Sequence, residues 1–112
     1  MKLPSAGVAI IALEKLRDYL LSLEGEDGRS QAIFFGGLGY TRDGWVTLEA
    51  DPRSQILPQD AEELTPSRFG RKFAIRASLV GPSGIVTGVA TIWIIQFGEE
   101  VPRFVTAYPK KL

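Results

Sequence analysis

The chain of 112 residues contains no cysteine and no histidine. Without cysteine there is neither a disulfide framework nor a thiolate metal site. Without histidine the usual zinc sites, Ser-His-Asp triads and imidazole acid–base pairs are absent as well. These absences exclude a large share of enzyme chemistry. Because the sequence also carries no specific metal or cofactor motif, we predict neither a metal site nor a cofactor.

Long hydrophobic runs are missing too. The longest apolar stretch extends from Ala6 to Leu13, whereas a membrane-spanning helix needs about 20 such residues. The first residues, Met1 to Ser5, have neither the charged segment nor the cleavage site of a secretory signal. We therefore expect a cytoplasmic protein with no membrane contact, unless the chain is carried on a larger protein.

The composition is that of one globular domain over residues 1–112, with 45% hydrophobic and 23% charged residues. The 13 basic and 13 acidic side chains balance, but they are unevenly spread. Residues 64–98 contain no acidic side chain and four basic ones, Arg68, Arg71, Lys72 and Arg76. This asymmetry is consistent either with an anionic partner or with ordinary solvated surface charge.

Helical periodicity dominates the first half of the chain. Leucines at three-to-four spacing predict an amphipathic helix over residues 13–23, and we expect further helices over 31–38 and 43–50, the last ending before Asp51-Pro52. Gly36 and Gly37 fall inside the second helix, where each costs about 1 kcal/mol relative to alanine. Close packing of the backbone is the expected reason for them.

After Pro58 the period changes to two, which is typical of strands. We predict strands over residues 71–79, 85–95 and 103–108, with a weaker edge strand over 61–64, and a type I turn at Gly81-Pro82-Ser83-Gly84. The fold class is therefore α+β: two to three N-terminal helices packed on one face of a three- to four-stranded antiparallel sheet.

The hairpin assigns the two faces of the sheet. If Gly81 and Gly84 close the turn, one face is apolar and forms the core, and it includes Phe73 and Ile75. The other face would gather cations, hydroxyls and rings: Lys72, Arg76, Thr91, Trp93, Phe104, Thr106 and Tyr108. Such a surface suits RNA, with cations for phosphates and rings for bases. Two other interpretations remain open: Trp93 packs beneath alkyl stems and nothing binds, or a partner protein or second copy buries this face.

Several stretches together resemble a bacterial domain family of unknown function. They are Leu3-Pro4, Ala9-Ile10-Ile11, Lys15 to Leu21, Gly28-Arg29-Ser30, Phe34-Phe35, Leu38-Gly39-Tyr40, Phe69-Gly70, Gly81 to Gly84, Trp93-Ile94 and Pro102-Arg103-Phe104-Val105-Thr106-Ala107-Tyr108-Pro109. The likeness covers nearly the whole chain, and the closing run is its most specific part. Members occur as small free-standing proteins, often beside a second small protein in a presumed toxin–antitoxin pair, and as C-terminal tips of polymorphic toxins.

The resemblance implies a ribonuclease-like toxin of the barnase, colicin and RelE type, with RNA and a small cognate neighbour protein as partners. Of the family pattern, this chain keeps Arg29, Trp93, Arg103, Thr106 and Tyr108. It departs from the pattern around Gly28, where a histidine and two cations are missing. If the family cleaves RNA with those groups, this member is inactive.

Metal-independent RNA cleavage needs a base for the 2′-hydroxyl, charge stabilisation at phosphorus and an acid for the leaving oxygen. We assign Arg76 and Arg103 to the phosphate and Tyr108 to proton transfer. The predicted nucleic-acid-binding residues are Lys72, Trp93, Thr91, Thr106 and Arg29. The alternative function is a non-catalytic module whose aromatic face docks a partner protein, either a neighbour or its own twin as a homodimer.

Overall fold

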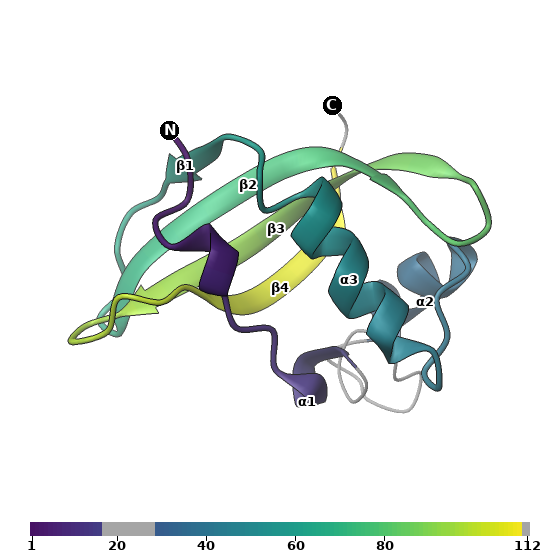
Figure 1. The fold of residues 1–112 in the computed structure, drawn as a ribbon, viewed down its shortest axis with the longest axis horizontal. Helices are drawn as coiled ribbons and strands as arrows, with labels where there is room; N and C mark the ends of the chain where they lie inside the picture. Colours follow the sequence, from purple (N-terminus) through teal and green to yellow (C-terminus); the bar gives the residue numbers. More distant parts are fainter. Residues whose placement is uncertain (17–28, 111–112) are drawn as a thin grey trace.

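A computed structural model describes residues 1–16 and 29–110. Short helical segments come first in the chain and four strands follow (Figure 1). The helical elements are η1 (Ala6–Val8), α1 (Leu13–Lys15), α2 (Arg29–Gly37) and α3 (Trp45–Gln55), and the strands are β1 (Ala61–Glu63), β2 (Gly70–Val80), β3 (Val86–Gln96) and β4 (Arg103–Pro109).

The strands form one antiparallel sheet in the order β1-β2-β3-β4. Buried side chains of α2, of α3 and of the segments on either side of η1 pack with the inward residues of the strands in a single cluster. In Figure 1, η1 and α3 pass in front of the sheet. We call the helix-covered side of the sheet the inner face and the opposite side the outer face. The predicted α+β architecture, with helices on one side of an antiparallel sheet, is confirmed.

The hairpin register differs by one residue from the predicted one. Phe73 pairs with Trp93 and Ile75 pairs with Thr91, because the loop contains three residues, not two. The amide of Gly84 donates to the Gly81 carbonyl (2.9 Å), the amide of Gly81 donates to the Ile85 carbonyl (3.2 Å), and Gly84 has φ +86°. A type I turn followed by a left-handed glycine is the geometry of a three-residue hairpin loop. Since the side-chain period is two, the slip moves every β3 side chain to the other face.

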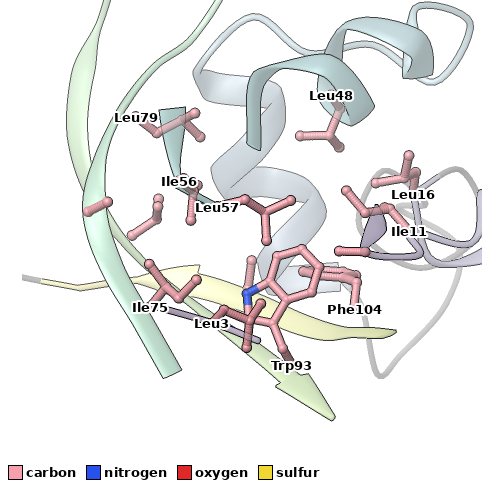
Figure 2. Close-up of a cluster of buried hydrophobic side chains, with 14 of the residues drawn as sticks. Leu3, Ile11, Leu16, Leu48, Ile56, Leu57, Ile75, Leu79, Trp93 and Phe104 are labelled. Atoms are coloured by element: carbon pink, nitrogen blue, oxygen red, sulfur yellow. The ribbon is translucent and has the colours of Figure 1, made fainter. Parts of the chain in front are cut away.

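The centre of the inner face is Trp93, whose side chain is fully buried. Its ring lies 5.4 Å from that of Phe104 in an edge-to-face arrangement, and Figure 2 shows both rings among Leu57, Leu3 and the aliphatic side chains around them. Phe73 and Ile75 also point inward, as predicted. The prediction that Trp93, Thr91 and Phe104 lie on the outer face is wrong, because the one-residue slip turns β3 over and an irregularity in β4 turns Phe104 inward.

Helix α3 runs through Asp51-Pro52, so the predicted end at Ala50 is wrong. Pro52 removes one backbone donor, but it is buried together with Leu48, one turn earlier. The Pro52 carbonyl accepts from Ile56 and Leu57 and so closes the C-terminal end. A buried stripe at four-residue spacing thus outweighs the missing hydrogen bond. Of the helix predicted over residues 13–23, positions beyond Leu16 lie outside the described residues.

Close backbone packing occurs at other glycines than the predicted ones. A Cβ atom on Gly36 or Gly37 would meet nothing within 4 Å, so our explanation for these two residues is wrong. On Gly81 a Cβ would lie 2.4 Å from the Leu38 carbonyl oxygen. The hairpin tip is fastened at the same place, because the Ser83 amide (3.0 Å) and hydroxyl (2.8 Å) both donate to that oxygen. The contact joins the C-terminal end of α2 to the β2–β3 loop.

Candidate functional site

The outer face consists of three rows of side chains that cross β2, β3 and β4. The strand pairing defines the rows as Lys72–Ile94–Arg103, Ala74–Ile92–Thr106 and Arg76–Ala90–Tyr108. Small or aliphatic residues of β3 occupy the middle, and cations or hydroxyls flank them on both sides. Residues two strands apart in one row are separated by about 10 Å. This arrangement is an apolar strip between two polar margins.

Five of the eight predicted site residues share this surface: Lys72, Arg76, Arg103, Thr106 and Tyr108. Two others do not, because Trp93 and Thr91 are buried on the inner face with exposed fractions of 0% and 1%. Buried side chains cannot stack on or bond to a nucleic acid without unfolding, so their predicted surface role is corrected to a structural one. Arg29 begins α2, and its side chain lies outside the described part of the chain.

Both arginines of the outer face hold a carboxylate of the same chain. Arg76 Nη1 lies 2.5 Å from Glu62 Oε2, and Arg103 Nη2 lies 3.2 Å from Glu99 Oε2. All four side chains are more than a third exposed, and exposed ion pairs of this kind contribute only about 0–1 kcal/mol. A phosphate that offers more oxygens to a guanidinium can therefore displace either carboxylate.

Lys72 and Tyr108 complete the set of polar groups at the margins. Both side chains are half-buried, and within residues 1–16 and 29–110 neither makes an ion pair or a side-chain hydrogen bond with the protein. The Lys72 ammonium and the Tyr108 hydroxyl are therefore available to a ligand without loss of an existing contact. In the third row, Tyr108 and Arg76 flank the fully buried Ala90.

The other cations of the basic segment lie elsewhere. Arg71 makes a two-pronged contact with Glu63, at 3.0 Å from each nitrogen, and its guanidinium lies 5.1 Å from the centre of the Phe73 ring. Hydrogen bonding from Arg71 lowers the pKa of the Glu63 carboxyl. Arg68 stacks on Phe69 at 4.9 Å. The basic segment thus divides between two faces, and only Lys72 and Arg76 belong to the outer one.

An open groove adjoins the first row at the end of the sheet. It has a volume of about 300 Å³, and Ile94, Gln96, Arg103 and Val105 line it on the strand side. Ile10, Ala12 and Lys15 close the other side. The two sides are joined by a parallel bridge, in which the Ile10 amide donates to the Pro102 carbonyl (2.9 Å) and the Phe104 amide donates to the Ile10 carbonyl (2.8 Å).

Sequence reasoning missed the groove and the acidic partners of the arginines. The i, i+4 spacing of Glu99 and Arg103 was a signal for one ion pair, although the intervening residues form a loop and not a helix. No local sequence pattern predicts the bridge between Ile10 and Arg103, because it joins positions more than 90 residues apart. Gln96 and Lys15 therefore did not enter the predicted site.

Within the described residues, no helix is both long enough and apolar enough to cross a membrane. The same part of the chain holds no group of three or more acidic side chains placed to bind a metal ion. A second hollow of about 10 Å³ lies in the core among Leu16, Phe35 and Thr91, and a space of that size holds at most one water molecule. The outer face and its groove are therefore the candidate site.

The fold and site define an α+β domain in which helices cover one face of a four-stranded antiparallel sheet and the opposite face carries the three rows described above. The profile of the DUF6883 family, a domain of unknown function, matches residues 2–111. The chain therefore belongs to this family, which confirms the expected likeness to a domain family of unknown function.

A solved structure has the same fold. A chain of the contact-dependent growth inhibition toxin–immunity protein complex from Klebsiella pneumoniae 342 superposes with a TM-score of 0.67 and 20% sequence identity. The alignment covers 96% of this chain and 98% of that chain. At this identity the likeness establishes a shared fold. No curated protein matches this chain.

Proposed function

We propose that this chain is a toxin-like domain of a bacterial toxin–antitoxin or polymorphic-toxin system and that it acts on RNA at the outer face. The single observation that carries the proposal is the row arrangement, in which Arg76 and Tyr108 flank Ala90 while Lys72 and Arg103 flank Ile94. The cations on the two margins can bind phosphates of an RNA strand, and the half-buried Ile94 offers apolar contact between Lys72 and Arg103. The shared fold with a chain of a toxin–immunity complex adds support.

In this proposal the reaction is a metal-independent cleavage by internal transfer. The 2′-oxygen of the ribose bonds to phosphorus as the bond from phosphorus to the 5′-oxygen breaks, which leaves a 2′,3′-cyclic phosphate and a 5′-hydroxyl. One proton leaves the 2′-hydroxyl and one reaches the departing 5′-oxygen, so the proton count is unchanged. Tyr108 carries one of these transfers and solvent water carries the other. Arg76, in the same row as Tyr108, stabilises the charge at phosphorus, and Arg103, two rows away, binds a neighbouring phosphate. Lys72 and Thr106 hold flanking parts of the RNA, and Arg29 adds a further phosphate contact.

The test is cleavage of a labelled oligoribonucleotide by the full chain, in the presence of a chelator, followed by separation of the products. We expect Arg103→Ala and Tyr108→Phe each to lower the cleavage rate by about 10²-fold or more. The matched control is Lys110→Ala, which removes an exposed cation next to the end of β4. A rate that both site variants leave unchanged would refute the assigned roles.

A second candidate function is a non-catalytic module that binds a partner protein. Exposed apolar side chains favour it: Phe69 and Phe97 are each more than 60% exposed, and they are neighbours, since the Phe97 amide donates to the Phe69 carbonyl at 3.1 Å. The partner would be a small cognate neighbour protein or a second copy of this chain. Added salt separates the two candidates, because RNA binding weakens steeply with salt whereas an apolar protein interface responds little.

A further inference from the structure

The groove beside the first row has features that the outer face alone lacks. The outer face is an open surface on a sheet, whereas the groove is a hollow with walls from two separate parts of the chain. Its volume of about 300 Å³ is at the lower end of the range for small-molecule sites. A site of this size accommodates one small group and not a peptide segment or a helix.

The chemistry of the lining selects the kind of group. Ile10, Ile94 and Val105 provide aliphatic contact, and Ile10 retains 38% of its surface exposed although it is a large apolar residue. Among the described residues that line the groove, Lys15 and Arg103 are cations and none is acidic. Glu99 holds the Arg103 guanidinium at 3.2 Å, in an exposed ion pair that a phosphate can displace. A ligand that matches has a small body with apolar surface and carries negative charge at its edge.

Gln96 adds the third element. A carboxamide offers one acceptor oxygen and two donor hydrogens. These groups can form hydrogen bonds with the edge of a nucleobase. Ile94 and Arg103 belong both to the groove and to the first row of the outer face. A strand of RNA that crosses the outer face along the first row, from Lys72 to Arg103, therefore reaches the mouth of the groove at Arg103.

We infer that the groove binds the base of one nucleotide, with the phosphate of that nucleotide against Arg103. The inference rests on the proposed action on RNA and adds to it a pocket for a single unstacked base. Recognition then combines phosphate contacts at Lys72 and Arg76 with one base contact in the groove. Single-stranded RNA is the substrate class this requires, because a base within a duplex is not free to enter a pocket.

The test uses the full chain and two small probes, followed by amide chemical shifts in NMR spectra. Uridine 3′-monophosphate supplies base and phosphate, and ribose 5-phosphate supplies the phosphate without a base. We expect the nucleotide to shift the amides of Ile10, Ile94 and Gln96, and the base-free sugar phosphate to leave these three unchanged. If the nucleotide leaves them unchanged, or if both probes shift them equally, the inference is overturned.

A groove-filling variant makes the test specific. Ala12 is exposed and lines the groove, so Ala12→Phe places a ring in the space assigned to the base. The matched control is Val46→Phe on α3, at another exposed position. We expect Ala12→Phe to weaken nucleotide binding by about tenfold or more, equivalent to 1.4 kcal/mol, and Val46→Phe to leave it unchanged. Equal binding by both variants would contradict the inference.

The outcomes for the groove and for the proposed function are distinguishable. Groove shifts with uridine 3′-monophosphate in a chain that neither binds nor cleaves RNA would leave a nucleotide site and remove the RNA function. Cleavage of an oligoribonucleotide by a chain whose groove amides do not shift would leave the RNA function and remove the groove from it. Weaker binding of uridine 3′-monophosphate than of a short oligouridine would show that the nucleotide belongs to an RNA strand; equal binding would point to a free nucleotide.

Discussion

The indole Nε1 of Trp93 donates a hydrogen bond of 2.8 Å to the Thr91 hydroxyl, and that hydroxyl donates in turn to the Ile75 carbonyl at 3.1 Å. Both side chains are fully buried, and they lie two residues apart on the same strand. The short chain of bonds satisfies the polar atom of the largest side chain in the core. It also explains why a threonine lies in the middle of an otherwise apolar face.

Thr91→Val therefore removes one partner from a buried donor while the shape of the side chain is kept. We expect the free energy of unfolding to fall by about 1–3 kcal/mol, the usual cost of an unsatisfied buried group. Chemical denaturation followed by circular dichroism measures it. Thr87→Val serves as the control, since Thr87 is only half-buried, and a change within about 0.5 kcal/mol is expected there. Equal losses in the two variants would contradict the role of the hydrogen bond.

The contact between α2 and the hairpin loop predicts opposite effects on stability for alanine substitutions at two glycines. Gly81→Ala places a methyl group 2.4 Å from the Leu38 carbonyl oxygen, and overpacking of this kind costs about 1–3 kcal/mol. Gly36→Ala adds a methyl group to an open site in α2 and should stabilise by about 1 kcal/mol. Thermal melting of the two variants measures both effects. A stabilised Gly81→Ala would show that the loop does not pack against α2 as described.

The same loop shows how far the sequence predicts this fold. Strict alternation in residues 71–79 was enough to predict the strand and to orient Phe73 and Ile75 toward the core. It could not supply the register with β3, because register depends on the conformation of one loop residue. Glycine at position 84 was the available signal, since a left-handed residue after a type I turn adds a third residue to the loop.

The candidate site, like the fold, was predictable from the sequence only in part. Lys72 and Arg76 follow from the alternation in β2 alone, and both lie on the outer face as expected. Trp93 depended on the register and was therefore misplaced. Phe104 depended on regular alternation in β4, which the irregularity opposite Ile92 and Trp93 interrupts. The groove could not be predicted, because the bridge between Ile10 and Arg103 comes from tertiary packing of distant segments.

Alkaline pH should destabilise the fold through Tyr40. Its hydroxyl donates to Asp51 Oδ2 at 2.6 Å, and burial, followed by this hydrogen bond, raises the pKa of Tyr40 well above its usual value of 10.0. The folded state thus favours the neutral phenol. The contribution of Tyr40 to the free energy of unfolding is fully present below the unfolded-state pKa near 10 and is lost as the pH rises above it.

The measurement compares wild type with Tyr40→Phe in denaturation experiments between about pH 8 and pH 11. Wild type should lose more stability than the variant at the alkaline end, because the variant has no phenol to ionise. Tyr108→Phe is the control, since Tyr108 makes no such hydrogen bond within the described residues and is only half-buried. Parallel curves for wild type and Tyr40→Phe would rule out the linkage.

The carboxylates on the two outer-face arginines predict that the chain restrains its own affinity for RNA. Glu99 occupies the Arg103 guanidinium through both Nε and Nη2 at 3.2 Å, where the proposed phosphate binds. Glu99→Gln removes this competing charge and leaves a side chain of the same size. We expect binding of a short oligouridine to strengthen by about two- to fivefold at low salt, in line with 0.2–1 kcal/mol for an exposed ion pair.

Glu100→Gln is the matched control for this last prediction. Glu100 is adjacent and exposed, and it makes no ion pair within the described part of the chain. The Glu100→Gln substitution changes the net charge by the same amount as Glu99→Gln. The difference in RNA binding between the two variants therefore isolates the local effect at Arg103 from general electrostatic attraction. Fluorescence anisotropy at several salt concentrations measures both, and the advantage of Glu99→Gln should shrink as salt screens the exposed charges. Equal gains for Glu99→Gln and Glu100→Gln would mean that Arg103 is not where the RNA phosphate binds.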